Sequence, residues 1–272
     1  MRTDERTAST RAASPRATPD AAPDAAPDAA PIPSQWRPPL REVALLMVYQ
    51  ARLLNLWLFL VMALSFLGAG GVVWLQLRIG GPQGMSQATQ VSQFTLESGA
   101  GLIAATLASS LVVGDPLLEV AMATRVGVYG VLLWRALLSF SALFLCSAAF
   151  LAWSLDMGIR YARQQSPLYL LLVWLAPVLV MGMLGLFGSL ATRNAALGMV
   201  IALLPLAGAL FFHGYLLPIQ ASHPFFIPYT SWAPDASDWW TNRLTLLGVA
   251  LVLGFGNWAL IRREERLLGD LH

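Results

Sequence analysis

The stretch GDPLLEVAMATRVGVYGVLLWR (Gly114–Arg135) lies between two long apolar runs of the sequence. It carries Asp115, Glu119, Arg125 and Arg135 in a chain that otherwise has few charges. The segment is too short to form a domain and too apolar to be a simple loop. Each flanking run is long enough to cross a membrane, so the stretch predicts a connection between two bilayer crossings.

The overall composition is that of a membrane protein. The 272 residues are 57% hydrophobic and 12% charged, and the mean hydropathy is +0.61. Soluble domains carry about 25% charged residues. The composition therefore predicts an integral membrane protein, and apolar runs of about 20 residues predict an all-α fold.

Six apolar runs are predicted to be transmembrane helices. Crossing about 30 Å of hydrocarbon at 1.5 Å per residue requires roughly 20 residues. The second run is the least apolar, because Glu97 lies in its outer turns. The predicted spans cover residues 53–77, 93–113, 131–155, 168–190, 195–217 and 244–261.

The distribution of arginine predicts the orientation, because cytoplasmic loops carry an excess of positive charge. With the N-terminus inside, the inner side holds Arg37, Arg41, Arg52, Arg125, Arg135, Arg193, Arg262, Arg263 and Arg266. The outer side holds Arg78, Arg160, Arg163 and Arg243. We therefore expect a multi-pass protein of the cell (plasma or inner) membrane with both termini in the cytoplasm. No signal-peptide pattern precedes the first span, which is expected to direct insertion itself.

The cytoplasmic stretch between the second and third spans is predicted to be a short helix at the inner surface. Asp115 stands where an N-cap would be, and Pro116 suits the first turn of a helix. Leu118, Met122 and Arg125 share one helical stripe.

Two segments precede the first span. In residues 1–39 the sequence PDAA occurs three times, and this Pro- and Ala-rich composition predicts a disordered cytoplasmic tail. Residues 40–55 have apolar positions at helical spacing and are predicted to form an amphipathic helix on the inner leaflet. The predicted domain division is thus residues 1–39 and a six-span domain of residues 40–272.

The absence of lysine excludes several activities, since all 17 basic residues are arginine. A Walker A loop and Schiff-base enzymes both require a lysine amine. The sequence also lacks the HExxH, GxSxG and CxxC motifs. We expect neither an enzyme nor a bound cofactor or metal, and no nucleic-acid partner. The lone Cys146 is expected to be a small packing residue.

Two polar residues of the spans are candidate pathway or gate residues. Glu97 could gate the outer end or tie two spans together, or it could lie solvated at the interface. His213, late in the fifth span, could serve a substrate or a proton, or it could be a packing residue.

The outer segment of residues 220–240 contains three tryptophans and prolines at positions 224, 228 and 234. It is interpreted as a folded lid anchored at the membrane interface, with an aromatic platform for a flat ligand such as haem as the alternative. Gly182, Gly185 and Gly188 recur every three residues and predict close helix packing.

Four stretches together resemble the ABC type-2 permease family, the membrane subunit of ABC exporters. Glu97, Asp115, Glu119 and Arg135 match the family pattern, whereas Pro116 stands where the family more often has Arg or Lys. The four stretches are the amphipathic helix of residues 40–55, Phe94–Leu137, GLFGSLATRN (Gly185–Asn194) and Asn242–Gly269.

The resemblance implies a transmembrane permease that is driven by a separate cytosolic ATP-binding subunit. ATP would be bound by that partner, and two permease copies or paralogues would line the pathway within the lipid bilayer. The region after Pro218 would form short re-entrant helices. The coupling helix of residues 114–125 would seat in the ATPase through Asp115, Pro116, Leu117, Leu118, Glu119, Met122 and Arg125.

Two alternatives remain from other classes of protein. An ion-coupled secondary carrier would work without an ATPase, although such folds usually have internal repeats that are not evident here. A haem-handling membrane protein would use the Trp-rich outer loop of residues 220–240. Proton-driven transport by the isolated chain would support the carrier, and a Soret absorption band would support the haem protein.

Overall fold

The computed structural model describes residues 56–111, 127–161 and 166–262. All of the described residues belong to one compact unit. All the regular secondary structure in the described ranges is helical. The predicted tail, the interfacial helix of residues 40–55 and the coupling segment of residues 114–125 lie outside them.

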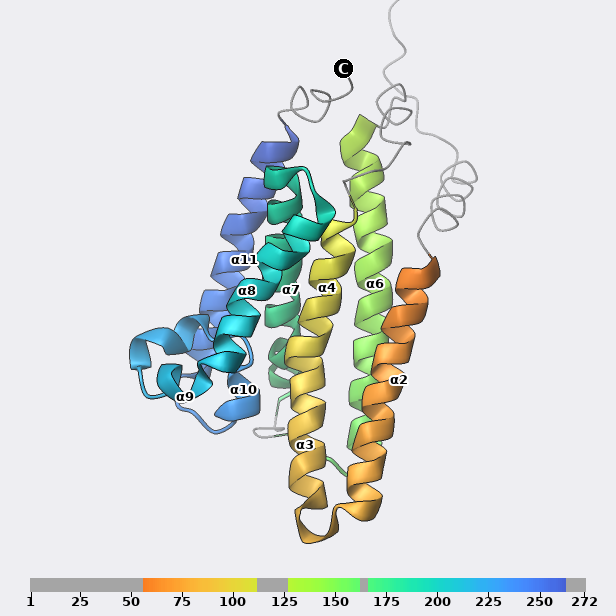
Figure 1. Cartoon of the computed structure of the whole chain (residues 1–272), viewed down its shortest axis with the longest axis vertical. Helices are drawn as coiled ribbons and strands as arrows, with labels where there is room; N and C mark the ends of the chain where they lie inside the picture. The colour runs from red at the N-terminus through yellow and green to blue at the C-terminus, as the bar shows by residue number, and fades with distance from the viewer. Residues whose placement is uncertain (1–55, 112–126, 162–165, 263–272) are drawn as a thin grey trace, which may run out of the picture. The chain divides into compact units, whose positions relative to one another are not determined.

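Within the ranges that the structure describes, four helices are long and apolar enough to cross a membrane, which indicates a multi-pass membrane protein and agrees with the predicted all-α class (Figure 1). They lie within a few residues of four predicted spans, although the last begins at residue 239 rather than 244. These helices are α2 (Leu56–Ile79), α6 (Gly127–Asp156), α7 (Pro167–Thr192) and α11 (Trp239–Ile261).

The other two predicted spans have different limits in the structure. Residues 84–109 form a continuous helical stretch of α3 (Gly84–Phe94), a π-helical segment η2 (Thr95–Gly99) and α4 (Ala100–Ser109). This stretch begins nine residues before the predicted start of the second span, at residue 93. Helix α8 (Ala195–Phe211) has 17 residues and ends six residues before the predicted limit of 217.

The turn between α2 and α3 depends on glycine. Gly81 has a φ of 56°, a left-handed conformation that glycine adopts without a steric penalty, at the start of η1 (Gly81–Gln83). A Cβ atom on Gly80 or Gly84 would lie 2.4 Å from the carbonyl oxygen of Gln76. The sequence GGPQG therefore allows α3 to fold back against α2.

Helix α7 packs against both α4 and α8 at positions that lack a side chain. A Cβ atom on Gly185 would lie 2.6 Å from the carbonyl oxygen of Ala105, and one on Gly188 would lie 2.9 Å from the Cα atom of Gly198. The predicted packing role of these small residues is confirmed. At the turn into α8, the Asn194 side chain accepts hydrogen bonds from the backbone N–H groups of residues 196 and 197.

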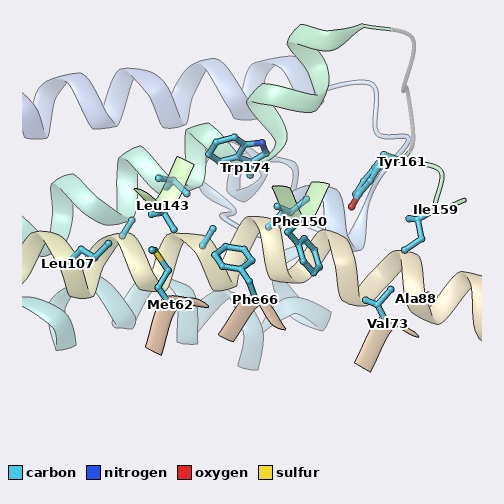
Figure 2. Packing of buried hydrophobic residues seen from close by; sticks show 14 residues of the cluster. Met62, Phe66, Val73, Ala88, Leu107, Leu143, Phe150, Ile159, Tyr161 and Trp174 are labelled. Atoms are coloured by element: carbon cyan, nitrogen blue, oxygen red, sulfur yellow. The ribbon is translucent and has the colours of Figure 1, made fainter. Parts of the chain in front are cut away.

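The largest apolar cluster lies between α2, α4, α6 and α7 (Figure 2). Phe66 of α2 faces Phe150 of α6, with ring centroids 5.7 Å apart. Outside this cluster, Leu67, Val252 and Phe255 remain about 70% exposed. Apolar side chains on the outer surface fit a protein whose surroundings are lipid tails.

Three short helices connect α8 to α11. They are α9 (His213–Leu216), the 3₁₀ segment η3 (Gln220–Phe225) and α10 (Tyr229–Trp232). Phe226, Tyr229 and Trp239 are buried in an apolar cluster of this region, together with residues of α7. The segment of residues 220–240 is thus folded against the long helices, which agrees with the folded state expected of the predicted lid.

Candidate functional site

Glu97 is completely buried. The sequence had predicted that it lies in the outer turns of the second span, close to the membrane surface. It belongs to the π-helical segment η2, between α3 and α4. A π-helical turn inserts one extra residue into a helix and is often found at functional sites. The insertion determines which way the carboxylate of Glu97 points relative to the flanking helices.

Both oxygen atoms of the Glu97 carboxylate accept hydrogen bonds from the short helix α10. Its Oε1 atom accepts a hydrogen bond from the backbone N–H of Thr230, with an N–O distance of 3.0 Å. Its Oε2 atom accepts from the backbone N–H and the hydroxyl of Ser231, at 2.8 and 2.6 Å. The carboxylate therefore takes the place of water for two backbone donors of the first turn of α10.

Arg243 of α11 supplies the positive charge for this site. Its Nη2 atom donates to Oε1 of Glu97, and both side chains have no solvent exposure. The same Nη2 atom donates to Oγ1 of Thr230 at 2.5 Å. Trp239 contacts both partners of this hydrogen bond. Its Nε1 atom donates to Oγ1 of Thr230 at 2.9 Å, and its ring centroid lies 5.4 Å from the guanidinium carbon of Arg243. A buried charge in a membrane protein requires such a partner.

We call the group of Glu97, Thr230, Ser231 and Arg243 the buried lock. It joins the second predicted span, the short helix α10 and the last span through direct hydrogen bonds. Of the three hypotheses for Glu97, tying spans together agrees with these contacts, solvation at the interface does not, and a gating role stays a prediction.

A second polar cluster lies in the connection between α8 and α11. His223 of η3 has both ring nitrogens against acceptors, with Nδ1 2.6 Å from Oδ2 of Asp238 and Nε2 2.7 Å from the carbonyl oxygen of Leu217. Each nitrogen must carry a proton to donate, so this geometry belongs to the imidazolium form. Tyr229 donates its hydroxyl proton to Oδ1 of Asp238 at 2.5 Å.

The electrostatics of this cluster agree with its geometry. The hydrogen bond to the Leu217 carbonyl and the hydrogen bond to Asp238 raise the pKa of His223. Burial opposes ionisation of Asp238, but hydrogen bonds from Tyr229 and His223 outweigh it and lower the pKa of this carboxyl. Burial and the hydrogen bond to Asp238 raise the pKa of Tyr229. These shifts favour the protonated form of His223, the ionised form of Asp238 and the neutral form of Tyr229.

The second predicted gate residue, His213, begins α9 and stacks on Trp232 of α10, with ring centroids 4.1 Å apart. Its Nδ1 atom lies 2.9 Å from the carbonyl oxygen of Leu210. Glu97 and His213 thus contact neighbouring residues of the same four-residue helix. The structure brings the two sequence candidates to one element.

Sequence reasoning missed Thr230, Ser231 and the pairing role of Arg243, which was counted only as an outer flanking charge. The available signal was that a carboxylate in a span requires a cation at the same depth, and Arg243 lies next to the predicted start of the last span, at residue 244. Arg135, which matches the family pattern at the third span, is buried in α6. The seven predicted coupling residues between Asp115 and Arg125 lie outside the described ranges.

Comparisons of the chain with protein-family models, with curated proteins and with solved structures find no match.

Proposed function

We propose that the chain is the transmembrane permease subunit of an ATP-binding-cassette exporter. It crosses the membrane six times, through α2, the continuous stretch α3–η2–α4, α6, α7, α8 and α11. Both termini lie in the cytoplasm, and the driving force comes from a separate cytosolic ATPase subunit.

The observation that carries this proposal is the contact between Glu97 and the first turn of α10. The family that the sequence resembles has a glutamate at the outer start of its second span and short re-entrant helices after a broken fifth span. In this chain α8 ends at Phe211, short helices follow, and the buried Glu97 binds one of them. The two family features therefore meet at one place, which supports the proposal more strongly than either pattern alone.

The buried lock could also transmit movement from the coupling segment, through α4, to α10 and α11. Helix α4 ends at Ser109, close in sequence to the coupling segment of residues 114–125. Glu97 lies twelve residues before Ser109, or about 18 Å along a helix. A movement of the coupling segment would tilt α4. Because Glu97 is hydrogen-bonded to α10 and α11, these two helices would move together with α4. Glu97 and Arg243 are positioning residues in this mechanism.

The composition supports a partner as the source of energy. Because the chain has no lysine, the Walker A lysine that contacts the nucleotide phosphates must belong to another polypeptide. Leu118 and Glu119 lie in the segment that would seat in that partner. Two permease copies, or one copy and a paralogue, would enclose the pathway.

Photo-crosslinking from the coupling segment tests the proposal. A photoreactive amino acid replaces Leu118 in the full chain, which is expressed in its own host and irradiated in membranes. We expect one major cross-linked product, identified by mass spectrometry as a protein with a GxxxxGK[ST] loop. The matched control places the same amino acid at Gln87, an exposed position of α3 near the opposite end of the second span, and should not capture that protein. Capture of the ATP-binding protein from both positions, or from neither, would contradict the proposal.

A further inference from the structure

A groove with a volume of about 590 Å³ lies between α2 and α6. Small-molecule sites in proteins usually have volumes of 300–1,000 Å³. The groove shares no residue with the buried lock, which involves η2, α10 and α11. Every lining residue is alanine, glycine, cysteine or a large apolar residue, among them Phe66, Leu67, Gly71, Trp74, Cys146 and Trp153.

The groove exists because glycines interrupt one face of α2. A Cβ atom on Gly71 would meet no atom within 4 Å, and one on Gly70 would lie 3.6 Å from the Trp153 ring. Phe66 and Phe150 pack against each other beneath the groove and belong to the cluster in Figure 2. The missing side chains therefore leave a hollow above a firmly packed base.

The groove is open to the surroundings of the helices, since Leu67 is 70% exposed and Trp74 is 48% exposed. Both of its helices are long and apolar enough to cross a membrane. Water is a poor occupant of an apolar hollow, because it would find no polar partners there. Hydrocarbon is the chemistry that fits the lining.

The length of the groove and the positive charge beyond one of its ends indicate which kind of hydrocarbon would bind there. From Ala63 to Trp74 it follows eleven residues of α2, or about 16 Å at 1.5 Å per residue, which is about half of the hydrocarbon core of a bilayer. Arg78 follows one turn beyond this end, with its guanidinium carbon 5.8 Å from the Trp74 ring centroid. Trp74 and Arg78 are side chains that favour the headgroup region. An acyl chain in the groove would place an anionic phosphate beside this guanidinium.

We propose that the groove between α2 and α6 binds one phospholipid, with an acyl chain along Gly70 and Gly71 and the phosphate at Arg78. The lipid comes from the leaflet at the C-terminal end of α2. It fills the gap between the two helices and joins their surfaces where their own side chains do not meet. This inference does not depend on the proposed transport function.

Photoreactive lipid tests the position of the acyl chain. The full chain is reconstituted in vesicles of phosphatidylcholine and phosphatidylglycerol that contain phosphatidylglycerol with a diazirine on one acyl chain. After irradiation, we expect the cross-links to concentrate on residues 63–74 and 146–153. Gly71→Leu fills the groove and should remove most of these cross-links. The control Gly68→Leu changes a position on the same helix that does not line the groove and has open space beside it, and it should retain them.

Native mass spectrometry tests the headgroup contact. Arg78→Gln should lower retention of phosphatidylglycerol by about fivefold, because a basic residue near an anionic headgroup contributes about 1 kcal/mol. Arg160→Gln, which removes another exposed arginine, should leave retention unchanged. Even labelling of all lipid-facing helices, unchanged cross-links in Gly71→Leu, or a second copy of the chain seated on α2 and α6 would overturn the proposal.

Discussion

Glu97 and Arg243 lie 146 positions apart in the sequence, and their side chains form an ion pair that has no solvent exposure. Between them stand Thr230 and Ser231, whose backbone N–H groups donate to the same carboxylate. One carboxylate of η2 thus connects this segment to both α10 and α11. The interaction carries a high desolvation cost, so its value lies in fixing how α10 sits against the two long helices.

The first prediction concerns the loss of either charge. Glu97→Gln and Arg243→Met should each lower the free energy of unfolding by about 3–5 kcal/mol, because each leaves an uncompensated buried charge or unpaired donors. The double variant should be more stable than the sum of the two losses implies, because neither charge then remains buried. Unfolding in mixed detergent micelles, followed by far-UV circular dichroism, provides the measurement. Strictly additive losses would show that the two side chains are not coupled.

The second prediction concerns the contacts of α7 with α4 and α8. Gly185→Ala and Gly198→Ala each place a methyl group within 3 Å of backbone atoms, so helices must separate. We expect a loss of about 1–3 kcal/mol for each variant. Gly208→Ala and Gly248→Ala are the matched controls, since their Cβ atoms would meet nothing within 4 Å. The controls should be neutral or stabilising by up to about 1 kcal/mol, because alanine is the better helix former. Equal losses in both pairs would contradict the close packing.

The long spans follow from the sequence because each is a continuous apolar run bounded by polar residues or turns. Helices α6 and α7 are examples, with ends within a few residues of the predicted limits. The early start of the second helical stretch was missed because the part of α3 before residue 93 carries Ser86, Gln87 and Gln90, which lower its hydropathy. Its helical state depends on packing against α2, where Ala88 is fully buried, and that contact is tertiary.

The buried lock shows where reasoning from the sequence stops. Glu97 was a candidate because it is a charged residue within a predicted span. Its pairing with Arg243 depends on how α10 and α11 pack against η2, and this packing is a tertiary contact. The backbone donors of Thr230 and Ser231 have no signature in side-chain chemistry. Short helices such as α9 and α10 have too few residues for a hydrophobic period to be recognised.

The third prediction concerns pH. The pKa of His223 is raised by its folded contacts, so its stabilising contribution is fully present below its ordinary pKa of about 6.5 and is lost as the pH rises through the raised value. The pKa of Asp238 is lowered, so its contribution is present above its ordinary value of about 4 and is lost as the pH falls through the lowered value. The region should therefore be most firmly held between about pH 4 and 6.5 and should loosen in alkaline solution.

Hydrogen exchange of residues 213–238, measured across this pH range by mass spectrometry, checks the prediction. Exchange, corrected for its intrinsic pH dependence, should accelerate as His223 loses its proton. In His223→Asn the corrected rate should be high at every pH. His213→Gln is the matched control, because His213 lies outside the pair with Asp238, and it should retain the wild-type pH profile. A wild-type profile in His223→Asn would show that another group controls the region.

The fourth prediction concerns ATP hydrolysis, and its measurement tests the central claim most directly. The complex is purified through a tag on this chain, reconstituted in lipid nanodiscs and assayed for ATPase activity. We expect ATPase activity with the wild-type chain, its loss with Leu118→Arg or Glu119→Arg, and its retention with Gln87→Arg. The chain alone should hydrolyse no ATP, because it has no lysine for a Walker A loop. Transport driven by a proton gradient in vesicles that contain only this chain, without nucleotide, would contradict the account.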